Sequence, residues 1–133
     1  MATRALTLER LPGRFAVVRL DPGSEVPRWA RGSSFASVTR TRHELSIVCD
    51  EAEVPASATR QGGFCGLRVS GPLDFSETGI LASLADPLAK AGISIFAVST
   101  YDTDYLFLPV ARESEAHAAL VRAGHTLQGV PTA

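Results

Sequence analysis

The sequence predicts an α+β protein in which antiparallel sheets carry helices on one face, and three observations lead to this prediction. First, 45% of the 133 residues are hydrophobic and 20% are charged, which supplies the core of one domain or of two very small ones. Second, the C-terminal half alternates strand patterns with two helical stripes. Third, the N-terminal half holds strand patterns with little helical periodicity.

The C-terminal half has the order β-α-β-β-α-β. Period-two or apolar segments predict strands, and apolar residues at helical spacing predict helices. The strands are expected at 64–70, 94–100, 104–110 and 125–130, and the helices at 77–91 and 112–123. This order is that of the split βαβ or ferredoxin-like arrangement, in which two helices cover one face of a four-stranded antiparallel sheet.

The first of these helices has a clear apolar stripe and one conflict. Asp74 and Glu77 are three residues apart, which predicts a capping box at its start. Gly92 is suited to the position after its end. Pro87 lies inside the helix, where it removes the amide donor to the Ser83 carbonyl, so we expect a kink there.

The N-terminal half resembles a reduced copy of the same plan. Strands are expected at 14–20, 34–41 and 44–49, the last two as a hairpin, with a single helical turn within 26–31. The segment 50–63 is acidic, then rich in Pro, Ala and Ser, and it ends in Gly62-Gly63. We therefore expect two lobes, a degenerate one at 1–62 and a complete one at 63–133.

The composition excludes several classes of protein. Thirteen basic and 14 acidic side chains argue against nucleic acid as the main partner. No apolar run has the length of a membrane span, and Met1–Leu11 lacks a secretory h-region, so we expect a cytoplasmic protein. No zinc-ligand spacing and no Gly-rich phosphate loop is present, so no metal and no cofactor is expected.

The cysteines and histidines give little support to catalysis. Cys49 and Cys65 fall on the apolar parity of predicted strands, where a free thiol acts as a small hydrophobe. His117 and His125 fall on or after a polar helix face and are expected to be solvated. A small thiol enzyme is therefore the weakest of three hypotheses, and no catalytic residue is predicted.

Several segments together resemble an ACT domain. They are Gly71–Phe75, Thr78–Ala82, Ala91–Tyr101 and Asp102–Tyr105. The sequence is similar to small bacterial tandem-ACT proteins, to the regulatory lobes of aspartate kinases and to CASTOR-type cytosolic arginine sensors. The hairpin 34–49 resembles the first lobe of the tandem proteins.

The resemblance implies a non-enzymatic regulatory protein, in the form of a homodimer, that binds a free amino acid at an interface between ACT lobes. The loop into the first helix, the strand after it and one strand of the first lobe would approach the ligand. Carried onto this sequence, these positions are Asp74, Phe75, Ser76, Glu77, Thr78, Gly79, Ile80, Ile95, Ala97, Val98, Ser99 and Thr100, with Ser37, Val38 and Thr39 from the first lobe.

Physical chemistry agrees with these positions. The start of a helix offers unpaired N–H groups and the positive end of the helix dipole, so the loop 74–79 is suited to an α-carboxylate. Asp74, Asp102 and Asp104 are suited to an ammonium or guanidinium group. Ser99 and Thr100 add hydroxyls at the end of a strand.

Structural roles compete with each of these functions. Asp102 and Asp104 flank a turn, where Asp is common, and Asp74 with Glu77 is explained by helix capping alone. Ser37, Val38 and Thr39 are also ordinary strand residues. The alternative to an amino-acid sensor is a protein-interaction module with a degenerate pocket that regulates a partner enzyme or complex. Neither the ligand nor the regulated target follows from the sequence.

Overall fold

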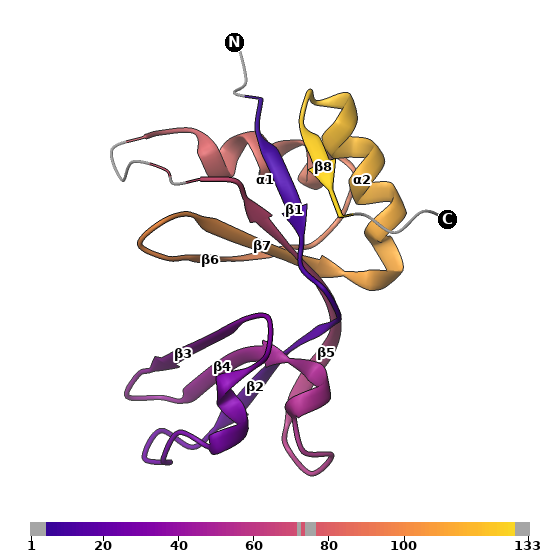
Figure 1. Ribbon diagram of the computed structural model, residues 1–133. Coiled ribbons are helices and arrows are strands. Elements are labelled where there is room, and N and C mark those ends of the chain that lie inside the picture. Colours follow the sequence, from indigo (N-terminus) through magenta and orange to yellow (C-terminus); the bar gives the residue numbers. More distant parts are fainter. Residues whose placement is uncertain (1–4, 72, 74–76, 130–133) are drawn as a thin grey trace. The chain divides into compact units, whose positions relative to one another are not determined.

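The chain folds into two compact units, which are described separately (Figure 1). The computed structural model describes residues 5–71, 73 and 77–129. One unit contains residues 12–64 and is called the N-terminal unit; the other contains the residues up to Leu11 and those from Cys65 onward and is called the C-terminal unit. Neither of the helices α1 and α2, which are described below, has the length and apolar character needed to cross a bilayer.

The sheet of the C-terminal unit has one strand more than the sequence predicts. Its strands follow the order β8-β1-β5-β7-β6. Their bounds are Thr7–Arg10 for β1, Arg60–Val69 for β5, Phe96–Ser99 for β6, Asp104–Pro109 for β7 and Thr126–Gln128 for β8. β1 runs antiparallel to β5 and parallel to β8, so it takes the place beside β5 that the split βαβ arrangement gives to the last strand.

The position of β1 corrects the expected division at 1–62 and 63–133. Leu8 is fully buried and pairs with Val69 on one side and Leu127 on the other. The Arg10 side chain forms an ion pair with Glu113 at the start of the second helix. The first strand therefore belongs to the C-terminal unit, because its apolar side chains are buried in that unit's core.

Two helices cover one face of this sheet, as predicted. Helix α1 spans Ile80–Lys90 and α2 spans Glu113–Arg122. Their apolar stripes share one core with the inward side chains of β1, β5 and β7. The buried members of this core are Leu6, Leu8, Cys65, Leu67, Val69, Ile80, Leu84, Leu88, Ile93, Leu106, Leu108, Ala116, Ala119 and Leu120.

Helix α1 begins later than the sequence predicts. Its N-cap residue is Gly79, which has a left-handed φ of 79° and provides no side-chain cap. Glu77 therefore precedes the helix and does not lie in its first turn; Asp74, the other member of the predicted capping box, lies outside the described residues. The helix continues through Pro87 to Lys90.

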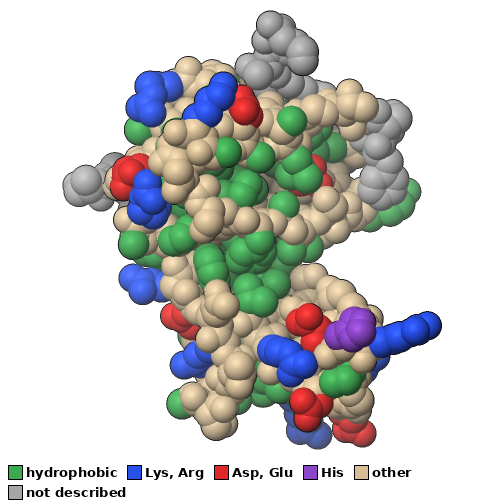
Figure 2. Space-filling view, turned by 180° about the vertical axis from the view of Figure 1, so that it is seen from behind, with side chains coloured by type: hydrophobic (Ala, Val, Ile, Leu, Met, Phe, Trp, Pro, Cys, Tyr) green, Lys and Arg blue, Asp and Glu red, His purple; other side chains and the backbone are tan. Residues whose placement is uncertain are grey.

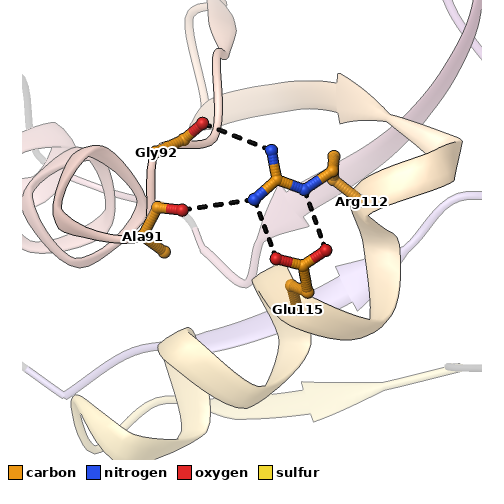
Figure 3. Close-up of polar contacts among 4 residues, drawn as sticks. All are labelled: Ala91, Gly92, Arg112 and Glu115. Atoms are coloured by element: carbon orange, nitrogen blue, oxygen red, sulfur yellow. Dashed lines mark hydrogen bonds and ion pairs between the residues drawn. The ribbon is translucent and has the colours of Figure 1, made fainter.

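An arginine closes the opposite end of α1 (Figure 3). The Arg112 guanidinium donates to the carbonyls of Ala91 and Gly92, at 3.2 and 3.3 Å. It also binds both carboxylate oxygens of Glu115, at 2.8 and 2.9 Å. The carbonyls of the two residues that follow α1 are thus bound by an arginine just before α2, which is held in turn by a bidentate ion pair to Glu115 within α2.

The N-terminal unit is a small antiparallel sheet with the order β3-β4-β2-β5, to which β5 contributes its first residues. Its other strands are Phe15–Leu20 for β2, Ala36–Arg40 for β3 and Leu45–Asp50 for β4. Residues 12–64 are all described and include two short 3-10 turns, at Arg28–Arg31 and Glu51–Glu53, but no α-helix. The predicted hairpin of β3 and β4 is confirmed, with Val38 opposite Ile47.

The Gly62-Gly63 pair lies inside β5 and does not form a linker. The pairing of β2 with β5 shifts register between Phe15 and Val17, which face Phe64 and Gln61. Gly63 has a φ of 79°, and its N–H donates to the Glu51 carboxylate at 2.7 Å. The pair is therefore part of a β-bulge. Glycine is typical of such bulges and of linkers alike, so the sequence pattern did not distinguish the two.

Asp50 organises the loop before β3. Its buried carboxylate oxygen accepts hydrogen bonds from the backbone N–H groups of Ser33, Ser34 and Phe35, at 2.8, 2.9 and 3.2 Å. Burial by itself raises the pKa of Asp50, but the three amide bonds outweigh it and hold the pKa below its ordinary value. The charged form of Asp50 is therefore part of the folded N-terminal unit.

We expect Asp50→Asn to destabilise the protein by about 1–3 kcal/mol at pH 7, because it weakens three hydrogen bonds to a buried charge. Since the pKa of Asp50 is lower in the folded state than in the unfolded chain, its stabilising effect is complete above the unfolded pKa of about 3.9 and is lost as pH falls through the lower folded pKa. Urea unfolding at pH 7 and at low pH measures both effects. The exposed Asp21→Asn is the control, and an equal loss in the two variants would contradict the prediction.

Candidate ligand-binding site

A cavity of about 340 Å³ lies entirely within the C-terminal unit. It is bounded by the start of α1, by the loop before α1 and by the turn that joins β6 to β7. The described residues that line it are Leu73, Glu77, Gly79, Ile80, Leu81, Ala82, Ser99, Thr100, Tyr101, Thr103 and Asp104.

One wall of the cavity is the first turn of α1. The first helical hydrogen bond runs from the Ser83 N–H to the Gly79 carbonyl, at 3.0 Å. The N–H groups of residues 80–82 therefore have no partner within the helix, and they lie at the positive end of the helix dipole. Because Gly79 provides no side-chain cap, this wall is suited to an anionic group.

The ends of β6 and β7 also line the cavity. Ser99 and Asp104 form a cross-strand pair, and the Ser99 hydroxyl donates to the Asp104 carboxylate at 2.6 Å. Asp104 is half-buried. A carboxylate held in this way is suited to a cationic group, since charge-assisted hydrogen bonds are the stronger ones.

The turn between these strands is anchored on both sides. The Thr100 N–H and hydroxyl both donate to the Thr103 carbonyl, at 2.9 and 3.0 Å. The buried Thr103 hydroxyl donates to the Val69 carbonyl at 2.7 Å, and the Leu73 N–H donates to the Asp102 carbonyl at 2.7 Å. The loop before α1, the turn and β5 are thus joined, so the cavity wall is held in place without a ligand.

The cavity lining is acidic and partly apolar. Its described residues include the carboxylates of Glu77 and Asp104 and no Lys, Arg or His. Tyr101 and Leu81 add apolar surface, and 83% of Tyr101 is exposed to solvent. The arrangement therefore combines a helix N-terminus, two carboxylates and an exposed aromatic ring, which suits a small ligand that carries both charges.

The structure brings together six of the residues that the sequence predicts for the site. They are Glu77, Gly79, Ile80, Ser99, Thr100 and Asp104. Thr78, Ile95, Ala97, Val98 and Asp102 do not line the cavity. Asp74, Phe75 and Ser76 lie outside the described residues, and Ser37, Val38 and Thr39 lie on β3 of the N-terminal unit.

Five lining residues are absent from the sequence prediction. Leu73, Leu81, Ala82, Tyr101 and Thr103 line the cavity because of the fold around them. Thr103 could have been included from the sequence, because it ends a turn that begins with Thr100, and Ser and Thr hydroxyls bond to nearby backbone in turns. The apolar members give no such signal.

The other groups that carry chemistry are structural. Both cysteines are free and buried, as predicted. Burial raises the pKa of each thiol to about 11, assisted by Asp50 and Glu53 at Cys49 and by Glu113 at Cys65. His125 is buried, contrary to the expectation that it is solvated, because it follows α2 into the core. Among the described residues, no cluster of His, Cys, Asp or Glu is arranged to hold a metal ion.

The C-terminal part of the chain matches the ACT domain family. The family's model, described as an ACT domain, matches residues 60–122. A second model, described only as the N-terminal domain of another family, matches residues 13–57. The fold is thus that of an ACT domain, and it is similar to the fold of aspartate kinase regulatory subunits.

Individual relatives agree with this assignment. A crystallised protein from Agrobacterium tumefaciens is 37% identical, with a TM-score of 0.90 over 95% of this chain and 94% of that one. The regulatory subunit of aspartate kinase from Thermus thermophilus is 10% identical, with a TM-score of 0.56 over 92% of this chain and 99% of that one; it shows the fold alone. The human cytosolic arginine sensor for mTORC1 subunit 1 is 46% identical over 44 residues, which are 32% of this chain and 13% of the sensor.

We expect both thiols to be unreactive in the folded protein. With a pKa of about 11 and no more than 1% exposure, Cys49 and Cys65 are almost entirely protonated and shielded at neutral pH. Ellman's reagent should label neither thiol under native conditions and both in denaturant. Rapid labelling of one native thiol would contradict this prediction and would revive the hypothesis of a thiol enzyme.

Proposed function

We propose that the protein is a non-enzymatic regulatory protein that binds a free amino acid in the cavity of its C-terminal unit. The observation that carries the proposal is that the start of α1, where Gly79 provides no side-chain cap, and the Ser99–Asp104 pair line the same cavity. The α-carboxylate would accept hydrogen bonds from the N–H groups of residues 80–82, and the α-ammonium would donate to Asp104. The ACT family supports this role, because the resemblance implies regulation by amino acids.

The charge of the lining supports an amino acid with a basic side chain. If Asp104 binds the α-ammonium, Glu77 is the second carboxylate at the cavity. No described Lys, Arg or His is present there to bind an acidic side chain. The name of the curated relative, an arginine sensor, points the same way. We therefore propose that basic amino acids bind better than acidic ones.

The same proposal includes a cytoplasmic homodimer, as the family resemblance implies. In that form, a second copy of the chain would supply the other side of the ligand site. Ser37, Val38 and Thr39 remain proposed ligand contacts under this arrangement. Analytical ultracentrifugation with and without the ligand tests it, and a monomer under both conditions would argue against it.

An interaction module remains the second candidate. On the face that Figure 2 presents, hydrophobic side chains gather in the middle of the C-terminal unit, in the upper part of the view. Strand β3 of the N-terminal unit is an edge strand, and 43% of Val38 on it is exposed. Exposed apolar patches and open strand edges are features of protein-binding surfaces. A stoichiometric partner that amino acids neither release nor recruit would favour this candidate.

We expect a thermal-shift screen of the twenty amino acids to identify a stabilising ligand. A ligand that binds only the folded state adds roughly 2.7 kcal/mol of stability at about 100 times its Kd. Basic amino acids should give the largest shifts, and acidic ones the smallest. The absence of a shift with any amino acid at millimolar concentration would overturn the proposed function.

We expect Asp104→Asn to weaken binding of that ligand by about tenfold or more, because it removes the charge from a hydrogen bond of roughly 1.5–3 kcal/mol. Asp102→Asn is the matched control. Asp102 lies in the same turn, and it does not line the cavity. Isothermal titration calorimetry measures both affinities, and an equal effect of the two substitutions would show that Asp104 does not contact the ligand.

A further inference from the structure

A proline in α1 leaves one helical carbonyl without its usual donor. The Ser83 carbonyl would normally accept the N–H of residue 87, but Pro87 has none. His125 supplies the missing partner, because its Nε2 atom lies 2.8 Å from the Ser83 oxygen. His125 is only 3% exposed, so solvent does not replace this bond.

The other ring nitrogen of His125 is also in use. Its Nδ1 atom accepts the N–H of Leu6 at 3.1 Å, immediately before β1. Since Nδ1 accepts from the Leu6 N–H, the ring donates to the Ser83 carbonyl through Nε2. The backbone of His125 is fixed as well, through its N–H to the Leu120 carbonyl at 3.1 Å. One side chain therefore joins α1 to the segment that leads into β1.

Ser83 in turn holds the wall of the ligand cavity. Its N–H closes the first helical bond to the Gly79 carbonyl, at 3.0 Å, and its buried hydroxyl donates to the Ile80 carbonyl at 2.7 Å. Gly79 and Ile80 both line the cavity. The polar groups of Ser83 are thus all bonded, two of them to the cavity wall and one to His125.

We propose that His125 is a positioning residue for the ligand site. It compensates for Pro87 at the Ser83 carbonyl and so holds the first turn of α1, where residues 80–82, whose N–H groups have no partner within the helix, line the cavity. The part of the inference that concerns ligand affinity rests on the proposed function, whereas the part that concerns the geometry of the turn does not. It also links ligand affinity to the docking of β1, since the same ring binds the Leu6 N–H.

The proline provides a direct test. Pro87→Ala restores an N–H to the Ser83 carbonyl, so the helix no longer needs His125 on that side. We expect His125→Leu to weaken the affinity for the amino acid found in the screen by roughly tenfold, and to weaken it by no more than about threefold when Pro87→Ala is also present. A comparable loss in both backgrounds would overturn the proposal, as would an unchanged affinity in His125→Leu.

Two controls separate positioning from general destabilisation. Arg112→Ala removes the contacts at the other end of α1, and it should lower stability without changing ligand affinity. His43→Leu changes an exposed turn histidine and should change neither. If His125→Leu fails to fold, His125→Met, which also removes both hydrogen bonds, replaces it in both backgrounds. A loss of affinity in Arg112→Ala equal to that in the His125 variant would reduce the role of His125 to stability.

Amide hydrogen exchange distinguishes this proposal from the proposed function. After correction for any change in the free energy of global unfolding, the amides of Ser83 and Leu84 should exchange faster in His125→Leu than in the wild-type protein. Adding Pro87→Ala should reverse this change. This measurement needs no ligand. If no amino acid binds the wild-type protein, the proposed function fails, and the exchange data alone decide whether His125 positions the turn.

Discussion

The pairing of β1 between β5 and β8 is the constraint on which the C-terminal unit depends. A four-residue strand from the start of the chain occupies an interior place in the sheet, with Leu8 fully buried. It brings Leu6 to His125, and through that ring it reaches α1. The N-terminal unit is therefore an insertion between two strands that pair with each other, and the order of residues in the sequence is not the order of the structural units.

The parts of the fold that were predictable have long or repeated patterns. The two helices have apolar stripes that recur over several turns, and β7 contains the buried run Leu106–Leu108. By contrast, β1 offers only Leu8 among polar residues, with Leu6 just before it, and this pattern is too short to separate from a loop. The Gly62-Gly63 pair is equally suited to a linker and to a β-bulge, and only the register of β2 with β5 decides between them.

The candidate site also contains residues that could be predicted from the sequence and residues that could not. Ser99 and Asp104 were predictable as neighbours because a hairpin with a short turn brings its strand ends together, whereas the start of α1 was expected at residue 77 and lies at Ile80. The apolar lining at Leu73 and Tyr101 depends on how the loop before α1 meets the turn, and that contact is between segments far apart in sequence. The sequence contains one indication that His125 is buried. Pro87 leaves the Ser83 carbonyl without its helical donor, so a buried group from elsewhere in the chain has to supply one.

The interior position of β1 also has a consequence for protein synthesis. The ribosome makes this strand before both of its neighbours, β5 and β8. The residues from Pro12 to Phe64 contain all the pairing partners of their own sheet and are made before β8. The N-terminal unit is thus free to form during translation, whereas the apolar side chains of β1 lack their full set of partners until β8 has been made.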